Sequence, residues 1–515
     1  MYHLRRITVA AVVVGAVIFL ATFLPRVLNP VPPSKEKQEA DQRWINTSPH
    51  WLDRQACRWF SLCGLLHLKS DPPTKPKNKD DHGHELRHIL GEDPAFFSRG
   101  GNSNTKSRLK EIPDYVLTYA PLVHLYSQEF FWPSDIADHM NHVTPDLDDD
   151  DDLLTFNESQ PLTLSNLNEL SSKLGFEHLN SKDNVESRPR WLHSKRNRPV
   201  AFPDNDEGEV QESEPDQFLS DETTWFEVDR DHPLQRISDP RKLPGGRTQR
   251  QGPLARRSLV TPFREQQRLM SPFAQDAQNE PNKPNDSGYS RAPATLVLVD
   301  KGSGIVDAFW FFFYAYNLGQ TVLGTRYGNH VGDWEHCMIR FEAGIPRAVF
   351  FSEHEGGQAY AWHAVEKHGN ETEIQRPVIY SAVGSHAMYA TPGNHPYVLP
   401  FGILKDVTDR GPLWDPSRNL RGYWYDYAAA DNEGLEPVKE NADAPTSWFH
   451  YNGTWGDKLY GLDDTRQWRL FGQYHYVTGP QGPKFKNLGR EKVCQTWRCR
   501  IIHSIAEGKK GSWHS

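Results

Sequence analysis

A stretch of eight residues, Asn-His-Val-Gly-Asp-Trp-Glu-His, contains four groups that can bind a metal or move protons: His330, Asp333, Glu335 and His336. The residues alternate as in a β-strand, so Asp333 and Glu335 share one face and His336 lies on the other. At the rise of a strand the two carboxylates stand roughly 7 Å apart. His330 precedes them at a glycine-bearing turn and can fold back over the pair. The pattern predicts a polar site at the end of a strand.

Two further segments place histidine beside serine, glutamate or glycine where an apolar strand ends. Ser-Glu-His-Glu-Gly-Gly contains Glu353 and His354, and Val-Gly-Ser-His-Ala contains Ser385 and His386. We expect the three segments to converge on one site. Carboxylates with one or two imidazoles suit Ca²⁺ or Mg²⁺ better than structural zinc, so the predicted cofactor is a divalent cation. The alternative is that each histidine is a hydrogen-bonded structural residue.

Catalytic residues are not identified by the sequence. It contains no Gly-x-Ser-x-Gly nucleophile elbow and no glycine-rich loop that could cradle phosphate. The adjacent Ser385 and His386 would face opposite sides of a strand, which does not suit a Ser–His pair. Cys337 faces the predicted core and is expected to pack rather than react. These observations argue against an enzyme, although they assign no activity.

The aromatic residues show where a core can form. The 515-residue chain has 16 tryptophans, 19 tyrosines and 25 phenylalanines, concentrated in residues 113–140 and 292–480. From residue 295 short β-branched and aromatic runs alternate with Gly, Pro and Asn clusters, and residues 112–126 also have strand character. The pattern predicts a mainly β fold, an antiparallel β-sandwich. The net charge of −9 provides no basic face, so nucleic acid is not an expected partner.

The N-terminal residues predict a membrane segment. Arg5 and Arg6 precede an apolar run, residues 7–24, that is just long enough to span a bilayer. No small-x-small cleavage motif follows, which favours an uncleaved signal anchor over a cleaved signal peptide. The arginines before the run favour a cytosolic N-terminus. We therefore expect a single-pass membrane protein with its body in the secretory or vacuolar lumen, or outside the cell.

The cysteines and glycosylation sequons agree with such a compartment. Cys57 and Cys63 form one close pair, Cys494 and Cys499 another, and Cys337 stands alone on the predicted core strand. The simplest count is two disulfides and one buried thiol, either pairing locally or tying the two ends together, and the alternative is unpaired thiols. Five Asn-x-Ser/Thr sequons predict a glycoprotein: Asn46, Asn157, Asn285, Asn370 and Asn452.

Composition divides the chain into six segments. An acidic block near residue 146 opens a stretch of low hydrophobicity that is expected to be disordered because it buries too little surface. The predicted segments are the N-terminus with its anchor (1–30), a polar stem (31–110), the first part of the β-sandwich (111–145), the disordered insertion (146–291), the main part of the sandwich (292–490) and a tail with a cysteine pair (491–515).

Several motifs resemble the fungal vacuolar protein sorting-associated protein 62 family. They are Tyr-Ala-Pro-Leu-Val at 119–123, Phe-Phe-Tyr-Ala-Tyr-Asn at 312–317, Gly-Asp-Trp-Glu-His at 332–336, Tyr-Ser-Ala-Val-Gly-Ser-His-Ala at 380–387, Trp-Gly-Asp at 455–457 and Val-Thr-Gly-Pro-Gln-Gly-Pro at 477–483. The resemblance covers about 112–140 and 292–490. It implies a part in delivering proteins to the vacuole, with protein cargo or sorting partners, and no established catalytic mechanism.

A more distant resemblance is to necrosis-inducing microbial toxins, which carry Gly-His-Arg-His-Asp-Trp-Glu on a cation-holding β-sandwich. The segment starting at Asn329 looks like a degenerate copy, which implies metal-site positions for His330, Asp333 and Glu335. Asn329, Val331 and Gly332 depart from the toxin residues. The toxins' additional upstream aspartate has no clear match, and Asn317 is the nearest polar candidate. The resemblance implies the sandwich fold and a cation site, whereas the predicted anchor argues against toxin activity.

The sequence therefore favours a membrane-anchored, lumen-facing binding or sorting protein with a divalent-cation site. The alternative is a metal-dependent hydrolase or a glycan-binding module in the secretory or vacuolar lumen. A third class, a membrane-acting cytolysin-like domain, would require lysis by the soluble body.

Overall fold

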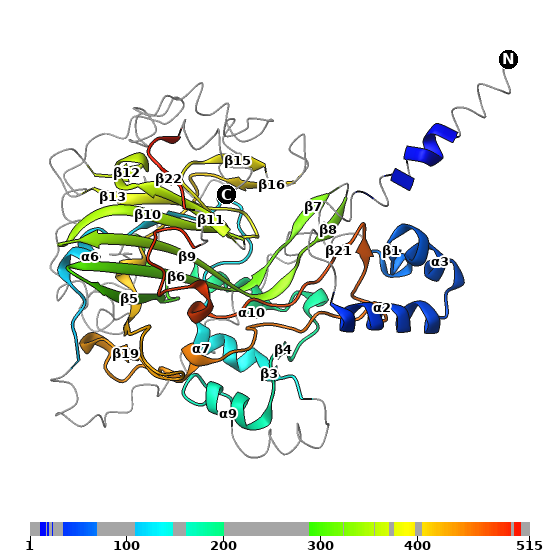
Figure 1. Cartoon of the computed structure of the whole chain (residues 1–515), viewed down its shortest axis with the longest axis horizontal. Helices are drawn as coiled ribbons and strands as arrows, with labels where there is room; N and C mark the ends of the chain where they lie inside the picture. The colour runs from blue at the N-terminus through cyan, green and yellow to red at the C-terminus, as the bar shows by residue number, and fades with distance from the viewer. Residues whose placement is uncertain are drawn as a thin grey trace, which may run out of the picture.

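The computed structural model describes residues 11–16, 18, 19, 23, 34–69, 109–147, 161–199, 288–322, 324–354, 356–369, 375–396, 404–495 and 499–505 (Figure 1). Its α-helices are α2 (Lys35–Thr47), α3 (Trp51–Phe60), α6 (Asp114–Thr118), α7 (Ile136–His139), α9 (Leu167–Leu174) and α10 (Arg190–His193). Short strands outside the two main sheets are β1 (Leu62–Cys63), β3 (Val143–Pro145), β4 (Leu179–Ser181), β7 (Gln320–Val322), β8 (Thr325–Tyr327), β15 (Gly393–Pro396), β16 (Lys405–Thr408), β20 (Arg469–Leu470) and β21 (Gln473–Tyr474).

The fold is built on an eight-stranded sheet with the order β19-β18-β5-β6-β9-β10-β11-β22. Its strands are β5 (Ala294–Gly302), β6 (Ile305–Asn317), β9 (His330–Glu342), β10 (Ile345–Glu353), β11 (Gly356–Ala361), β18 (Leu420–Tyr425), β19 (Leu435–Pro437) and β22 (Ile501–Ile502). Strands β5, β6, β9, β10 and β11 run antiparallel in succession, while β18 pairs parallel to β5 and β22 parallel to β11.

A second sheet combines strands from distant parts of the sequence. It contains β12 (Lys367–His368), β13 (Arg376–Ser381), β2 (Leu122–His124) and β17 (Leu413–Trp414), with β14 (Met388–Tyr389) paired to β13. Strand β2 pairs parallel to β13 and antiparallel to β17. The mainly β prediction is confirmed. The all-antiparallel prediction is wrong, because three strand pairs formed by distant segments are parallel and leave both main sheets mixed.

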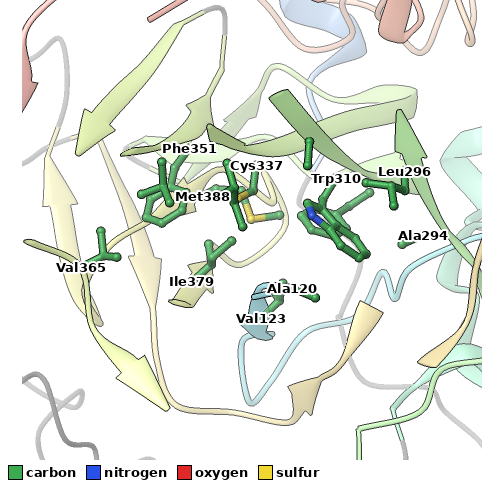
Figure 2. Packing of buried hydrophobic residues seen from close by; sticks show 14 of the residues in the cluster. Ala120, Val123, Ala294, Leu296, Trp310, Cys337, Phe351, Val365, Ile379 and Met388 are labelled. Carbon is green, nitrogen blue, oxygen red and sulfur yellow. The ribbon is translucent and has the colours of Figure 1, made fainter. Parts of the chain in front are cut away.

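The central strands explain the long aromatic run in the sequence. Strands β6 and β9 lie in the middle of the large sheet and are buried on both faces, and in β6 apolar residues occupy nearly every position. Trp310 and Phe312 of β6 contribute to the core cluster that also contains Val123 and Ile379 of the second sheet (Figure 2), whereas Phe311 faces the opposite cluster. Each such side chain stabilises the fold by about 1.5–3 kcal/mol through burial.

Two sequence expectations about secondary structure were wrong. Residues 114–118 form helix α6, and only Leu122–His124 of the predicted 112–126 strand is extended. Residues 161–199 were assigned to the disordered insertion, yet they form α9, β4 and α10. Leu167, Leu179 and Leu192 of this segment are fully buried, and these widely spaced apolar residues were too sparse to predict folding from composition. The rest of the predicted insertion lies outside the described residues.

Residues 34–69 of the predicted stem are folded and contact the body of the protein. Helices α2 and α3 precede β1, which pairs antiparallel with β20, so the stem lies against residues near the end of the chain (Figure 1). The Cys57–Cys63 disulfide joins α3 to β1, and Cys494 pairs with Cys499. The predicted two disulfides are therefore present, both local, and Cys337 is a buried free thiol.

Half of the predicted anchor, residues 7–24, lies outside the described part of the chain. Among the residues that are described, no helix combines the length and apolar character needed to cross a bilayer. The sequons at Asn157, Asn285 and Asn370 also lie outside it, whereas Asn46 and Asn452 are described and exposed.

Candidate functional site

The three histidine-bearing segments meet where β9 begins, β10 ends and residues 383–387 turn. Asp333 stands opposite Tyr314 of β6 in the sheet register, and the Tyr314 ring stacks on His386 at 3.7 Å between centroids. His386 Nδ1 lies 3.0 Å from Asp333 Oδ2, and its Nε2 lies 3.0 Å from the carbonyl oxygen of Phe131. Because Tyr314 and His386 are fully buried, the pair has one fixed geometry.

The partners of His386 determine where its protons lie. A carbonyl oxygen can only accept, so Nε2 must carry a hydrogen and donate to Phe131. Nδ1 then either donates to an ionised Asp333 or accepts from a protonated one. In both cases one proton is shared between Asp333 and His386. The buried Glu129 lies near the other ring nitrogen of His386, with its Oε2 3.9 Å from Nε2.

Glu335 lies on the same face of β9 as Asp333, as the alternation predicted. It accepts a hydrogen bond from the Ser352 hydroxyl, whose oxygen accepts from the backbone N–H of His336 at 2.8 Å. Burial and the neighbouring charge of Asp333 raise the pKa of Glu335 well above its ordinary value. Both influences favour the protonated form of Glu335.

Asp406 of β16 is the centre of the second half of the site. This fully buried carboxylate accepts from Ser385 Oγ at 2.7 Å, Gln320 Nε2 at 2.8 Å and Tyr389 OH at 2.8 Å, and pairs with His354 Nε2 at 2.7 Å. Burial acts to raise the pKa of Asp406, but the His354 charge and the hydrogen bonds outweigh it and hold the pKa below its ordinary value. Asp406 is thus ionised and fully hydrogen-bonded.

His354 is an exposed member of the site, with 39% of its side chain accessible to solvent, whereas Gln320, His330 and Glu353 are half-buried. Burial acts to lower its pKa, but the charge and hydrogen bond of Asp406, with Glu335 and Glu353, raise it to about 9. Burial raises the pKa of Glu353 to about 8. At neutral pH the site therefore presents the imidazolium of His354 beside the protonated carboxyl of Glu353, a pair of proton donors suited to an anionic or carbonyl ligand.

Three predicted site residues have other surroundings. His336 faces the opposite side of β9, 5.2 Å from the Phe311 ring between centroids, and burial lowers its pKa well below the ordinary value. His330 lies at the strand start with Nδ1 2.6 Å from the Gly332 carbonyl oxygen. Asn317 donates to the Gly328 carbonyl at 2.8 Å. His336 is therefore separated from the other predicted residues by the sheet.

The predicted cation site can be compared with these contacts. Asp333 Oδ2 faces His386, Glu335 Oε2 bonds Ser352, and His330 Nδ1 faces a carbonyl. Within the described ranges, no three His, Cys, Asp or Glu side chains come together in a way that could hold a metal ion. In this arrangement the three side chains contact protein groups. The Ca²⁺ or Mg²⁺ site remains a prediction.

Sequence reasoning missed Asp406, Gln320, Tyr389 and Glu129. Glu129 shapes the turn before His386, because its Oε2 accepts from the Gly384 N–H at 2.8 Å and its Oε1 from two backbone N–H groups of its own loop. Asp406 lies in the short segment Lys-Asp-Val-Thr, which resembles many surface strands. The sequence around Asp406 shows only an acidic residue followed by a valine, a pattern that does not predict a buried carboxylate.

Similarity to known proteins is extensive. A sequence model described as vacuolar protein sorting-associated protein 62 matches residues 308–466. The putative vacuolar protein sorting-associated protein TDA6 of Saccharomyces cerevisiae is 34% identical over 456 residues, covering 84% of this chain and 80% of that protein. The chain belongs to the vacuolar protein sorting-associated protein 62 family. Vacuolar protein sorting-associated protein 62 of the same yeast is 32% identical over 429 residues, covering 80% of this chain and 74% of that family member.

Two solved structures show a limited similarity to this family member. One is necrosis and ethylene inducing protein 2 from the causal agent of witches' broom disease of cocoa, at 17% identity and a TM-score of 0.15, covering 22% of this chain and 53% of that one. The other, described as a toxin fold for microbial attack and plant defense, has 13% identity and a TM-score of 0.15, covering 26% and 56%. Similarity this limited carries no conclusion about activity.

Proposed function

We propose that this chain is a membrane-anchored component of protein sorting to the vacuole that binds its ligand at the polar cluster around His354. The names of both yeast relatives support the sorting role. Residues 7–24 are the proposed anchor, and two disulfides in the body support an oxidising lumen. Asn46 and Asn452 are the exposed sequons available for glycosylation there.

The observation that carries the binding role is the exposed, charged ring of His354. Its Nε2 is held at 2.7 Å by a buried carboxylate whose other bonds come from Ser385, Gln320 and Tyr389. An imidazolium kept in one orientation can form a charge-assisted hydrogen bond with a carboxylate of a protein cargo. Glu353, whose pKa is raised to about 8, is mostly protonated at neutral pH and does not repel such a ligand. A binding component rather than an enzyme is the simplest use of this arrangement.

A sorting assay tests this proposal. In a host strain lacking its own family member, the wild-type chain should restore delivery of a vacuolar reporter enzyme, and His354→Gln should leave most of the reporter secreted at equal protein level. Glu342→Gln is the control, because Glu342 is the last residue of β9, at the end of the strand away from Asp333, and its side chain is half exposed. Full rescue by His354→Gln would refute the binding role.

The divalent cation remains part of the proposal and has its own test. A cation bound beside Asp333 and Glu335 would favour the ionised form of Glu335, whose pKa burial raises, so Ca²⁺ or Mg²⁺ uptake should release protons. Calorimetric titration in two buffers of different ionisation enthalpy measures that release, and elemental analysis measures bound metal. Absence of both heat and metal in the folded protein, with Asp333→Asn behaving as wild type, would remove the cation from the proposal.

A further inference from the structure

Helix α3 presents large apolar side chains to solvent. Trp51 is 60% exposed, Leu52 is 74% exposed and Trp59 is 69% exposed, with Phe60 and Leu66 exposed beside them. At about 100° per residue, the four helical residues fall within one half of the helix circumference. We call these residues the α3 face: Trp51, Leu52, Trp59, Phe60 and Leu66. Gln55 lies between the two tryptophans on the helix and accepts from Trp59 Nε1 at 3.1 Å, so the face is mainly apolar with one polar residue within it. Large apolar side chains gathered at the surface in this way mark an interaction site.

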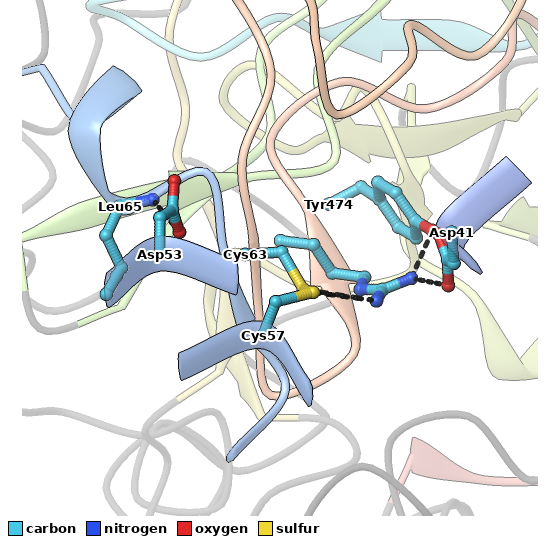
Figure 3. The surroundings of a disulfide bond; sticks show 7 residues. Asp41, Asp53, Cys57, Cys63, Leu65 and Tyr474 are labelled. Carbon is cyan, nitrogen blue, oxygen red and sulfur yellow. Dashed lines mark hydrogen bonds and ion pairs between the residues drawn. A yellow bond between two sulfur atoms is a disulfide. The ribbon is translucent and has the colours of Figure 1, made fainter. Parts of the chain in front are cut away.

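The α3 face is held rigidly by the opposite side of the helix. Asp53 is 3% exposed and accepts from the Leu65 N–H at 3.2 Å, and Cys57 forms the disulfide with Cys63 (Figure 3). Arg469 of β20 then bonds Asp41 of α2 and, at 2.8 Å, the Tyr474 hydroxyl. The exposure of the apolar side chains is therefore a feature of a fixed, cross-linked unit.

The charges on α3 indicate the kind of surface that it fits. Its only acidic residue, Asp53, is turned inward, whereas Arg54 is partly exposed and Arg58 is exposed. An apolar face with tryptophans near both ends and arginines at its border is typical of helices that lie in a membrane interface. Tryptophan suits this position because its ring is apolar and its N–H is polar.

The chain length between the proposed anchor and the stem limits their separation. Ser34 caps the start of α2 and lies ten residues after Leu24, the end of the apolar run. Ten residues span at most about 35 Å when fully extended. If residues 7–24 cross the bilayer, α2 and α3 therefore stay within reach of the lipid surface, where the α3 face can be buried.

We propose that the α3 face binds the surface of the lipid bilayer and orients the body relative to the membrane. This inference deepens the proposed function and rests on its anchor for proximity, while the binding surface itself is separate from the anchor. Lipid contact would bury Trp51, Leu52 and Trp59 and place Arg54 and Arg58 among anionic headgroups.

Vesicle flotation of the full chain tests the proposal. A protease recognition sequence placed between residues 25 and 33 allows the anchor to be cut after reconstitution into vesicles of phosphatidylcholine with phosphatidylserine. The cut wild-type body should stay on the vesicles. Leu52→Glu with Trp59→Glu should lower its partitioning at least about tenfold, since each side chain loses its apolar burial. Ile345→Glu, an apolar residue of the body that is 54% exposed, is the matched control and should float as wild type.

The outcomes separate the α3 face from the anchor. Release of the cut wild-type body overturns the α3 proposal, and carbonate-resistant flotation of the uncut chain would then still support the anchor. If carbonate removes the uncut wild-type chain from the vesicles, and the double variant does not float even without carbonate, the result supports the α3 face and refutes the anchor. A released body that forms a dimer sensitive to Leu52→Glu would assign the face to a second copy of the chain and overturn the proposal.

Discussion

Replacing Asp406 by asparagine tests the electrostatics of the candidate site most directly. The substitution keeps the shape of the side chain and one carbonyl acceptor, but removes the negative charge 2.7 Å from His354 Nε2. The pKa of His354 is about 9 although burial alone lowers it, and Asp406 is the largest influence that raises it. Glu335 and Glu353 raise it less than Asp406 does, and burial raises the pKa of each of these two acids.

The expected result is a fall in the pKa of His354 from about 9 to below its ordinary 6.5. One pKa unit corresponds to about 1.4 kcal/mol. Because 39% of the His354 side chain is exposed, solvent screens its interaction with Asp406, which we therefore take to stabilise the protein by about 1–2 kcal/mol. Loss of the buried charge also weakens the hydrogen bonds from Ser385 and Tyr389. Together these losses should destabilise the protein by about 3–5 kcal/mol near pH 6.

The assay is an NMR titration of the full chain with its 23 histidines labelled at Cε1, with His354→Gln identifying the resonance. Tyr389→Phe is the matched control, because it removes one hydrogen bond to Asp406 and no charge. In that variant His354 should still titrate near pH 9 while stability falls by about 1–2 kcal/mol. A His354 that titrates near pH 9 in folded Asp406→Asn, or near 6.5 in the wild type, would refute the reasoning.

Three further outcomes are expected. The melting temperature should fall between pH 6 and pH 9. The folded pKa of His354 is raised from 6.5 to about 9, so the stability that it contributes is complete below pH 6.5 and is lost as the pH rises through 9, and Glu353, whose pKa is raised from 4.5 to about 8, keeps a proton that the unfolded chain has already lost. Differential scanning calorimetry should show a shallower fall of melting temperature with pH in Glu353→Gln than in the wild type. Gly332→Ala should lower the free energy of unfolding by about 2–4 kcal/mol, because φ is +68° and a Cβ would stand 2.4 Å from a carbonyl oxygen, whereas Gly302→Ala, at φ +78° in open space, should cost only about 1 kcal/mol in the same denaturant titration. The full chain produced in a fungal host should lose apparent mass when it is treated with a glycosidase, and Asn46→Gln should reduce that loss by the mass of one glycan. An Asn46→Gln variant that runs at the wild-type position on a gel would contradict glycan attachment at this exposed sequon.

Local patterns in the sequence determined the character of the main strands. Alternation along β9 correctly placed Cys337 in the core between the sheets and Trp334 on the other face, because successive strand residues point to opposite sides. The cysteines in the sequence predicted two disulfides and one buried thiol, whereas the local pairing was decided by the structure. The three histidine segments also share one region of the structure, since each follows or begins a strand at the same end of the sheets.

Tertiary structure decided how those residues are used. The sequence separated Asp406 from His354 by 52 residues and Glu129 from Gly384 by 255, so neither contact has a local signature. Parallel pairing of β2 with β13 depends on the same kind of long-range packing, and the helix at 114–118 replaces a strand that propensity favoured. Periodicity fixes the face that a side chain takes, because it is a property of the local backbone. The charge and pKa of that side chain depend on burial and on partners that only the folded chain brings within hydrogen-bonding distance.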